Sequence, residues 1–219
     1  IAAFCILPAK NSVELTGEGS LKKAYEALKF KLEQEGLFER KRVLPEFIQK
    51  IGVITSRTGA VIDDFRKNLE KLGIEIFLHD ARVEGAKAVP EITHAIRWFN
   101  ARMPELDILV IIRGGGSLED LQAFNNEIVV REIFASRIPT ICGIGHDRDI
   151  PIANLAADRE TSTPSIAAML INGSWNRLRE ELPNYQAKVI FTYGGEIERS
   201  LAEIRRVTGT FLGYFRLLA

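Results

Sequence analysis

The sequence predicts an α/β fold, a doubly wound parallel sheet flanked by helices, with a helical C-terminal extension. Two observations lead to this fold class. Short apolar segments alternate with segments of helical periodicity between about residues 50 and 145. The apolar segments, such as LDILVIIR at 106–113, are apolar on both faces, which is typical of parallel strands that helices cover on both sides. No internal repeat interrupts the alternation.

The first expected element is an amphipathic helix that the Gly-Ser pair 19–20 caps and that ends near Gly36. Apolar side chains lie on one stripe of this helix, opposite lysines and glutamates: Leu21, Ala24, Tyr25, Leu28 and Leu32. The segment KIGVITS at 50–56 then predicts a short buried strand. A second helix is expected over 58–73, where apolar residues again share a face and a glycine follows the last of them.

The alternation continues to residue 145. We expect a strand over 74–83, a helix that includes Ile92 to Phe99, a strand over 106–113, a helical stretch over 118–136 and a strand over 139–145. Further on, Thr163 is placed to cap a helix and Pro164 to occupy its first position. Beyond Ser174, Pro183 and the pair 194–195 of glycines predict separate helical pieces. Residues 17–172 would therefore form the α/β domain and residues 173–219 the helical extension.

The composition fits one sizeable core with extensions, because 46% of the 219 residues are hydrophobic. Basic and acidic side chains both number 29, so net charge neither supports nor excludes a polyanionic partner. Of the two cysteines, Cys142 lies in an apolar run, which predicts a buried thiol and a reducing, cytoplasmic setting. The apolar runs are too short to span a membrane and the first residues lack a basic leader, so we expect a soluble protein.

The loop RGGGS at 113–117 follows one expected strand and opens a helical stretch. Consecutive glycines let backbone N–H groups converge on an anion, and a helix N-terminus adds partial positive charge. Arg113 offers a bidentate fork for phosphate. These features predict a phosphate site formed by Gly114, Gly115, Gly116 and Ser117 beside Arg113. Alternatively, the glycines form a tight turn that is needed because a helix packs closely on the strand.

The loop TSRTGA at 55–60 leaves a second strand at the same edge of the sheet. Its hydroxyl side chains belong to Thr55, Ser56 and Thr58, and they are either phosphate ligands, for which we select Ser56 and Thr58, or a helix cap. Asp63 and Asp64 follow near the start of the next helix, a position where the helix dipole favours a carboxylate in any case.

The loop after the strand at 139–145 carries His146 between a glycine and two nearby carboxylates, Asp147 and Asp149. A histidine that a carboxylate orients can act as general acid or base near neutral pH. A solvated charge cluster is the alternative. With Arg113 at the same edge, the combination of cation, histidine and carboxylate suggests phosphodiester hydrolysis.

Four segments resemble motifs of the exodeoxyribonuclease VII large subunit family, in the same order. They are GVITSRTGAVIDD, VEGAKA, RGGGSLEDLQAFNNEIVVREIFASRIPTICGIGH and ADRETSTPSIAA. The resemblance covers roughly residues 17–168 and implies four catalytic positions: Asp64, Arg113, His146 and Asp149. It also implies an enzyme that degrades single-stranded DNA from both ends to short oligonucleotides, with no cofactor and no added divalent metal. We expect the four side chains to converge at the carboxyl edge of the sheet.

The resemblance also implies partners. Family members pair with multiple copies of a small helical subunit along a long coiled coil, of which residues 173–219 would be part, and have an N-terminal OB-fold, of which residues 1–16 would be a remnant or linker. Two other classes stay open from the residues alone. A nucleotide-dependent transferase or dehydrogenase would use the same sheet edge, although the sequence lacks GxGxxG followed by an acidic residue about 20 positions later. A phosphate-binding module without chemistry is the other.

Overall fold

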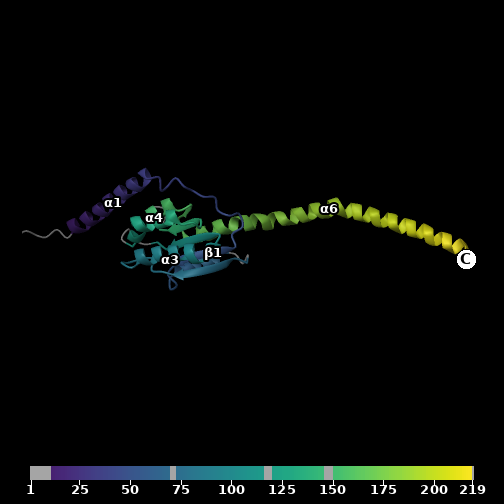
Figure 1. Ribbon diagram of the computed structural model, residues 1–219, viewed down its shortest axis with the longest axis horizontal. Helices are drawn as coiled ribbons and strands as arrows, with labels where there is room; N and C mark the ends of the chain where they lie inside the picture. Colours follow the sequence, from purple (N-terminus) through teal and green to yellow (C-terminus); the bar gives the residue numbers. More distant parts are fainter. Residues whose placement is uncertain (1–10, 70–72, 116–119, 146–149, 219) are drawn as a thin grey trace, which may run out of the picture. The chain divides into compact units, whose positions relative to one another are not determined.

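The computed structural model describes residues 11–69, 73–115, 120–145 and 150–218 (Figure 1). The chain divides after Asn172 into two compact units, residues 1–172 and residues 173–219. The first unit holds the sheet and its covering helices, and the second is helical.

The first unit is built on a five-stranded sheet in which every neighbouring pair of strands is parallel. Its strands are β1 (Lys50–Thr55), β2 (Glu75–Asp80), β3 (Ile108–Arg113), β4 (Thr140–Ile144) and β5 (Arg159–Thr161). Their spatial order is β2-β1-β3-β4-β5, one of the two common orders of doubly wound, Rossmann-like sheets. The predicted fold class is therefore confirmed.

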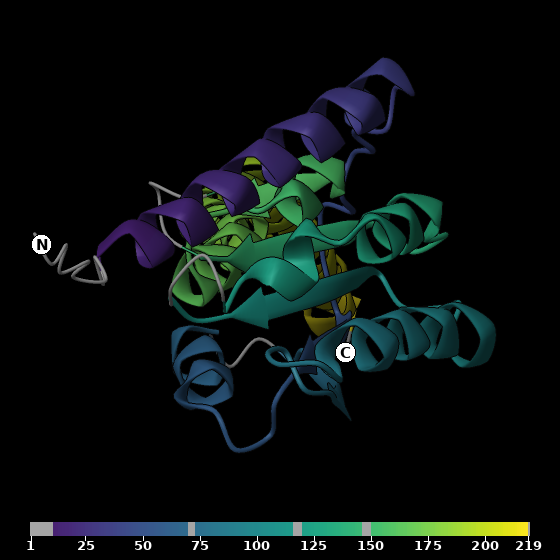
Figure 2. The same ribbon diagram turned by 90° about the vertical axis from the view of Figure 1, so that its left-hand side faces the viewer.

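Helices cover both faces of the sheet (Figure 2). One face packs against α1 (Asn11–Gln34), α3 (Ala88–Arg102), α4 (Glu127–Ala135) and α5 (Ile152–Ala156). The other face packs against α2 (Ala60–Asn68) and the first turns of α6 (Pro164–Leu218). Alternate residues of β3 enter the two cores: Leu109 and Ile111 face the first, and Ile108, Val110 and Ile112 face the second. This explains why the strand segment is apolar on both faces.

Gly143 in β4 marks a close approach between strands. A Cβ atom at this position would lie 2.9 Å from Oγ1 of Thr161 and 3.3 Å from Cγ2 of Ile112. The Thr161 hydroxyl lies 3.3 Å from the carbonyl oxygen of Thr163, to which it donates a hydrogen bond. The missing side chain at 143 thus lets β5 and the start of α6 pack tightly on β4.

Two helix starts differ from the sequence prediction. Helix α1 begins at Asn11, so the Gly-Ser pair 19–20 lies inside the helix and does not cap it. The helical stretch expected over 118–136 is a short 3-10 helix, η1 (Gln122–Asn125), followed by α4. Asn126 separates these two helices, because its extended backbone ends η1 and its side chain caps α4 by accepting a hydrogen bond from Ile128 N.

Helix α6 is one continuous helix of 55 residues, so the prediction of separate helical pieces is wrong. Pro183 removes one backbone hydrogen bond inside it, and each glycine of the pair 194–195 lowers helix propensity by about 1 kcal/mol. These local costs do not end a helix whose other residues favour continuation. Within the described residues, no helix combines the length and apolarity needed to cross a membrane.

Candidate active site

The carboxyl ends of β1 and β3 form the topological switch point of the sheet. The chain runs from β1 to β2 on one side, whereas β3 lies on the other side of β1. Loops that leave two such strands diverge and create a crevice, where open α/β sheets bind their ligands. The RGGGS and TSRTGA segments of the sequence begin at these two strand ends. The loops that carry the predicted phosphate-binding residues therefore lie at the edge of the sheet where a ligand is expected to bind.

Arg113 is the last residue of β3, and its guanidinium group makes three polar contacts. Its side chain is only 7% exposed. Nη2 lies 3.2 Å from Oε2 of Glu84 and 3.7 Å from Oδ2 of Asp120. Nη1 donates a hydrogen bond of 3.2 Å to the carbonyl oxygen of Gly114. The guanidinium group is thus a positive charge fixed at the crevice, with two carboxylates beside it.

Gly114 lies close to helix α2. A Cβ atom there would be 3.1 Å from Cγ2 of Val61, and the φ of Gly114 is not positive. Close packing of the strand end on α2 therefore accounts for Gly114. The predicted ligands Gly116 and Ser117 lie outside the described residues, so the anion nest stays a prediction.

Ser56 and Thr58 do not cap α2, contrary to one interpretation of the sequence. The N-cap of α2 is Gly59, which has no side chain to cap the helix. The hydroxyls of Ser56 and Thr58 instead lie 3.2 Å apart and share a hydrogen bond. The backbone N–H of Arg57 donates to Oδ1 of Asp80 at 2.8 Å, which ties this loop to the end of β2. Both hydroxyls thus follow the carboxyl end of β1.

Asp64 lies exposed on α2, and its carbonyl oxygen accepts a hydrogen bond of 2.7 Å from Nδ2 of Asn68. Because Val61 and Asp64 are three residues apart, they lie on neighbouring turns of the same side of the helix. Asp64 is therefore one turn beyond the contact between Val61 and Gly114.

The other two catalytic candidates, His146 and Asp149, lie outside the described residues. The strand before them is described, and its Ile144 pairs in register with Arg113 of β3. The expected convergence of all four side chains stays a prediction. Among the described residues, no cluster of three or more His, Cys, Asp or Glu side chains could hold a metal ion.

Cys142 is fully buried in β4, as predicted. Burial raises the pKa of its thiol far above the ordinary value, so the thiolate does not form near neutral pH. This cysteine is a structural residue of the core.

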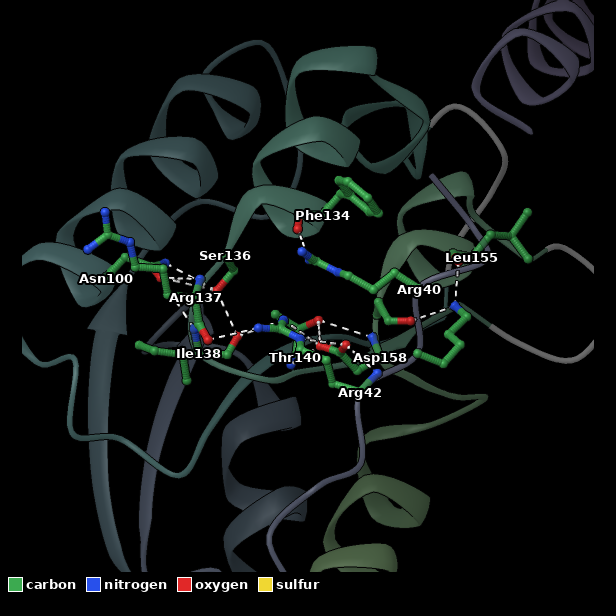
Figure 3. A network of polar contacts seen from close by, with 12 residues as sticks. Arg40, Arg42, Asn100, Phe134, Ser136, Arg137, Ile138, Thr140, Leu155 and Asp158 are labelled. Carbon is green, nitrogen blue, oxygen red and sulfur yellow. Dashed lines mark hydrogen bonds and ion pairs between the residues drawn. The ribbon is translucent and has the colours of Figure 1, made fainter. Parts of the chain in front are cut away.

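At the opposite, amino edge of β4, a polar network surrounds Asp158, which is 3% exposed (Figure 3). Arg42 donates to its carboxylate through Nε at 2.8 Å and Nη2 at 2.7 Å, and Thr140 donates through its backbone N–H at 2.7 Å. Burial by itself would raise the pKa of Asp158, but the hydrogen bonds from Arg42 and Thr140 lower it to about 2. Arg40 donates to the carbonyl oxygen of Phe134 nearby. We call the hydrogen-bonded set of Arg42, Thr140 and Asp158 the Asp158 clasp.

Sequence reasoning missed both Glu84 and the Asp158 clasp. Glu84 belongs to VEGAKA, a segment that follows β2 and so leaves the sheet at the same edge as Arg113. An acidic residue that follows a strand at the same edge as a predicted arginine site could have predicted this ion pair. The clasp gave no comparable signal. Asp158 lies in the segment ADRETSTPSIAA, but nothing in the sequence relates it to Arg42 or Thr140.

Together, the strand order and the buried arginine at the switch point define a doubly wound α/β protein with a candidate phosphate site at the carboxyl edge of its sheet. Comparison with known proteins identifies the group within this class. The family model described as "Exonuclease VII, large subunit" matches residues 37–216, and the chain belongs to this family.

Curated relatives carry a corresponding name, exodeoxyribonuclease 7 large subunit. The chain is 49% identical over 164 residues to the exodeoxyribonuclease 7 large subunit of Thioalkalivibrio sulfidiphilus. This match covers 73% of the chain and 36% of that relative. It is 44% identical over 197 residues to the protein of that name from Syntrophotalea carbinolica, covering 88% of the chain and 48% of that relative. For the Streptococcus pneumoniae protein the identity is 48% over 162 residues, with coverage of 72% and 36%. The chain thus spans between about a third and a half of the length of these relatives.

Proposed function

We propose that the protein is a single-strand-specific exodeoxyribonuclease that hydrolyses DNA phosphodiester bonds to short oligonucleotides. Family membership supports the reaction class. The observation that carries the proposal for this chain is the guanidinium of Arg113, which is held at the switch-point crevice, where a doubly wound sheet binds phosphate-bearing ligands.

In this proposal the scissile or an adjacent phosphate docks at Arg113, with backbone N–H groups of 114–117 and the hydroxyls of Ser56 and Thr58 as further donors. The arginine fork neutralises charge that builds up on the phosphate oxygens as the bond to the leaving oxygen breaks. Such groups act best when they are fixed before the substrate arrives, and the buried position of Arg113 supports this role.

We further propose that proton transfer falls to His146, as general base on water or as general acid on the leaving oxygen. Asp149 would orient its ring, and Asp64 would position water or take part in a second proton transfer. The fixed positive charge of Arg113 can supply the charge stabilisation that a divalent metal gives in other nucleases. The reaction is therefore proposed to need no divalent metal.

Digestion of 5′-labelled DNA tests substrate and metal dependence together. The intact protein with its partner subunit should convert a labelled single strand to short oligonucleotides and leave a blunt duplex of the same sequence uncut. The rate should be unchanged by excess EDTA, because no step uses a bound cation. Activity that disappears with EDTA and returns with Mg²⁺ would instead identify a metal-dependent nuclease, and equal cutting of the duplex would contradict single-strand specificity.

We also propose that residues 173–219 are part of a coiled coil that binds multiple copies of a small helical subunit. Exposed apolar side chains recur on this part of α6 at spacings of three or four residues, as in a coiled-coil seam. They include Leu178, Leu182, Tyr185, Val189, Tyr193, Ile197, Leu201 and Ile204. Water-exposed apolar stripes of this length indicate a partner surface. Such an assembly would act in the cytoplasm, in DNA repair.

Sedimentation of the intact protein with the small subunit tests this surface. The wild-type protein should form a complex of larger mass, and Leu182→Glu with Val189→Glu should weaken it, because charges on the seam must be desolvated. As a control, Arg199→Gln changes an exposed polar residue of the same helix and should leave the complex intact. Absence of association by the wild-type protein would refute the proposed partner.

A further inference from the structure

The contact between Glu84 and Arg113 brings an acidic side chain to the proposed phosphate site. Oε2 of Glu84 lies 3.2 Å from Nη2 of Arg113 and accepts its hydrogen bond. The two side chains differ in environment, since Glu84 is 68% exposed and Arg113 only 7%. The buried cation is thus fixed by the fold, whereas the anion that covers it reaches in from solvent.

The charges at this point do not leave Arg113 ready to receive phosphate. Two carboxylates, those of Glu84 and Asp120, lie within 4.0 Å of its guanidinium group. A phosphodiester needs the same N–H donors and carries the same sign of charge as these carboxylates. A DNA phosphate can therefore use all of these donors only when a carboxylate moves away. Glu84 is the more exposed of the two carboxylates, so moving it into water costs less free energy than moving Asp120.

The loop that carries Glu84 is anchored on both sides. Before it, Val83 is buried, and after it Ala88 is fully buried and donates its backbone N–H to the carbonyl oxygen of Gly85 at 3.1 Å. Gly85 has a φ of +77°, a turn conformation that glycine adopts without strain. Glu84 therefore stands at an exposed turn, and its side chain can rotate away without moving the buried residues beside it.

We propose that Glu84 is a displaceable counter-ion that occupies the phosphate-binding donors of Arg113 until DNA takes its place. This role assigns a residue of the VEGAKA segment to the site and rests on the proposed function. Glu84 would make the site selective for ligands that can outcompete a carboxylate, and it would lower affinity for DNA without taking part in the chemical step.

Glu84→Gln tests the proposal in the intact protein with its partner subunit. The amide keeps the size of the side chain but removes the charge, so KM for a single-stranded oligonucleotide should fall about two- to fivefold, the range of an exposed ion pair. The value of kcat should stay within about twofold. A higher salt concentration should reduce the difference in KM between Glu84→Gln and the wild type, because the carboxylate and the DNA phosphate compete electrostatically for Arg113. Glu75→Gln, at the other end of β2, removes an equal charge and should leave KM unchanged.

Two outcomes would overturn the proposal. One is an unchanged KM. The other is a kcat that falls tenfold or more at constant KM, which would mean that Glu84 holds Arg113 in its catalytic position.

A binding measurement separates this proposal from the nuclease proposal. Fluorescence anisotropy with a labelled phosphorothioate single strand should show tighter binding by Glu84→Gln than by wild type, and an uncharged methylphosphonate strand should show no difference. If neither protein cleaves DNA, the nuclease proposal fails, while the anisotropy result still decides the role of Glu84. Equal affinity of both proteins for the charged strand would refute the counter-ion role.

Discussion

Replacing Arg113 by alanine should lower kcat on single-stranded DNA about a thousandfold, because a fixed arginine that stabilises charge on a reacting phosphate is worth several powers of ten. Arg113→Lys should recover only part of this loss, since an ammonium group keeps the charge but lacks the planar fork. Initial rates with a labelled oligonucleotide measure both variants. Arg137→Ala removes an exposed arginine just before β4, at the opposite edge of the sheet, and serves as the control that should retain activity.

The structure indicates that Arg113→Ala will fold. The carboxylates that pair with Arg113, Glu84 and Asp120, are 68% and 49% exposed, so water can solvate both when the guanidinium is gone. Circular dichroism and thermal unfolding should therefore resemble the wild type. Near-normal cleavage by the folded variant would refute the role of Arg113. In the Arg113→Ala background, Glu84→Gln should no longer change the affinity for DNA, because the cation for which it competes is absent.

The second large effect is expected on stability. Asp158→Asn should lower the free energy of unfolding by about 3–5 kcal/mol, the usual cost of breaking a buried ion pair by removing one partner. The carboxylate accepts hydrogen bonds from Arg42 and Thr140, and an amide would turn an N–H₂ group toward donors that need an acceptor. Urea unfolding of the variant measures the loss. Glu127→Gln removes the charge from the half-exposed pairs with Lys31 and Arg131 and should cost much less, because water screens these pairs.

Acid should reveal the same interaction. The pKa of Asp158 is about 2 in the folded protein, against an ordinary value of 3.8. A depressed pKa means that the folded state favours the charged form, so its contribution of about 2 kcal/mol is complete above the ordinary pKa and is lost as pH falls toward 2. Between about pH 4 and pH 2, the stability of the wild type should therefore fall more steeply than that of Asp158→Asn. Parallel curves over this window would contradict the assignment.

Local signals in the sequence predicted the sheet well. The segments at 106–113 and 139–145 form interior strands of the sheet. Helices cover both faces of these strands, so most of their residues are apolar, and this run of apolar residues can be recognised in the sequence. Signals for helix ends were less reliable. The Gly-Ser pair 19–20 lies inside α1 and Pro183 inside α6, since each is only one local preference among many residues that favour a helix.

Contacts between distant residues could not be predicted in this way. Glu84 meets Arg113 across 29 positions, and Arg42 meets Asp158 across 116. Each pair forms because the strand order brings two loops together, so the pairing depends on the fold as a whole. Arg113 itself was predictable, because its place at the end of an apolar strand fixes it at the carboxyl edge.

In the Asp158 clasp, Asp158 accepts a hydrogen bond from Thr140, the first residue of β4. At the other end of this strand, Ile144 pairs in register with Arg113. Four steps along a strand separate the two ends by about 13 Å. Selection can therefore act on two nearly separate sets of residues. Mutations that change substrate preference can accumulate in the loops at the carboxyl edge of the sheet, while the Asp158 clasp at the amino edge keeps the strands in register. The activity can therefore change during evolution without loss of the fold.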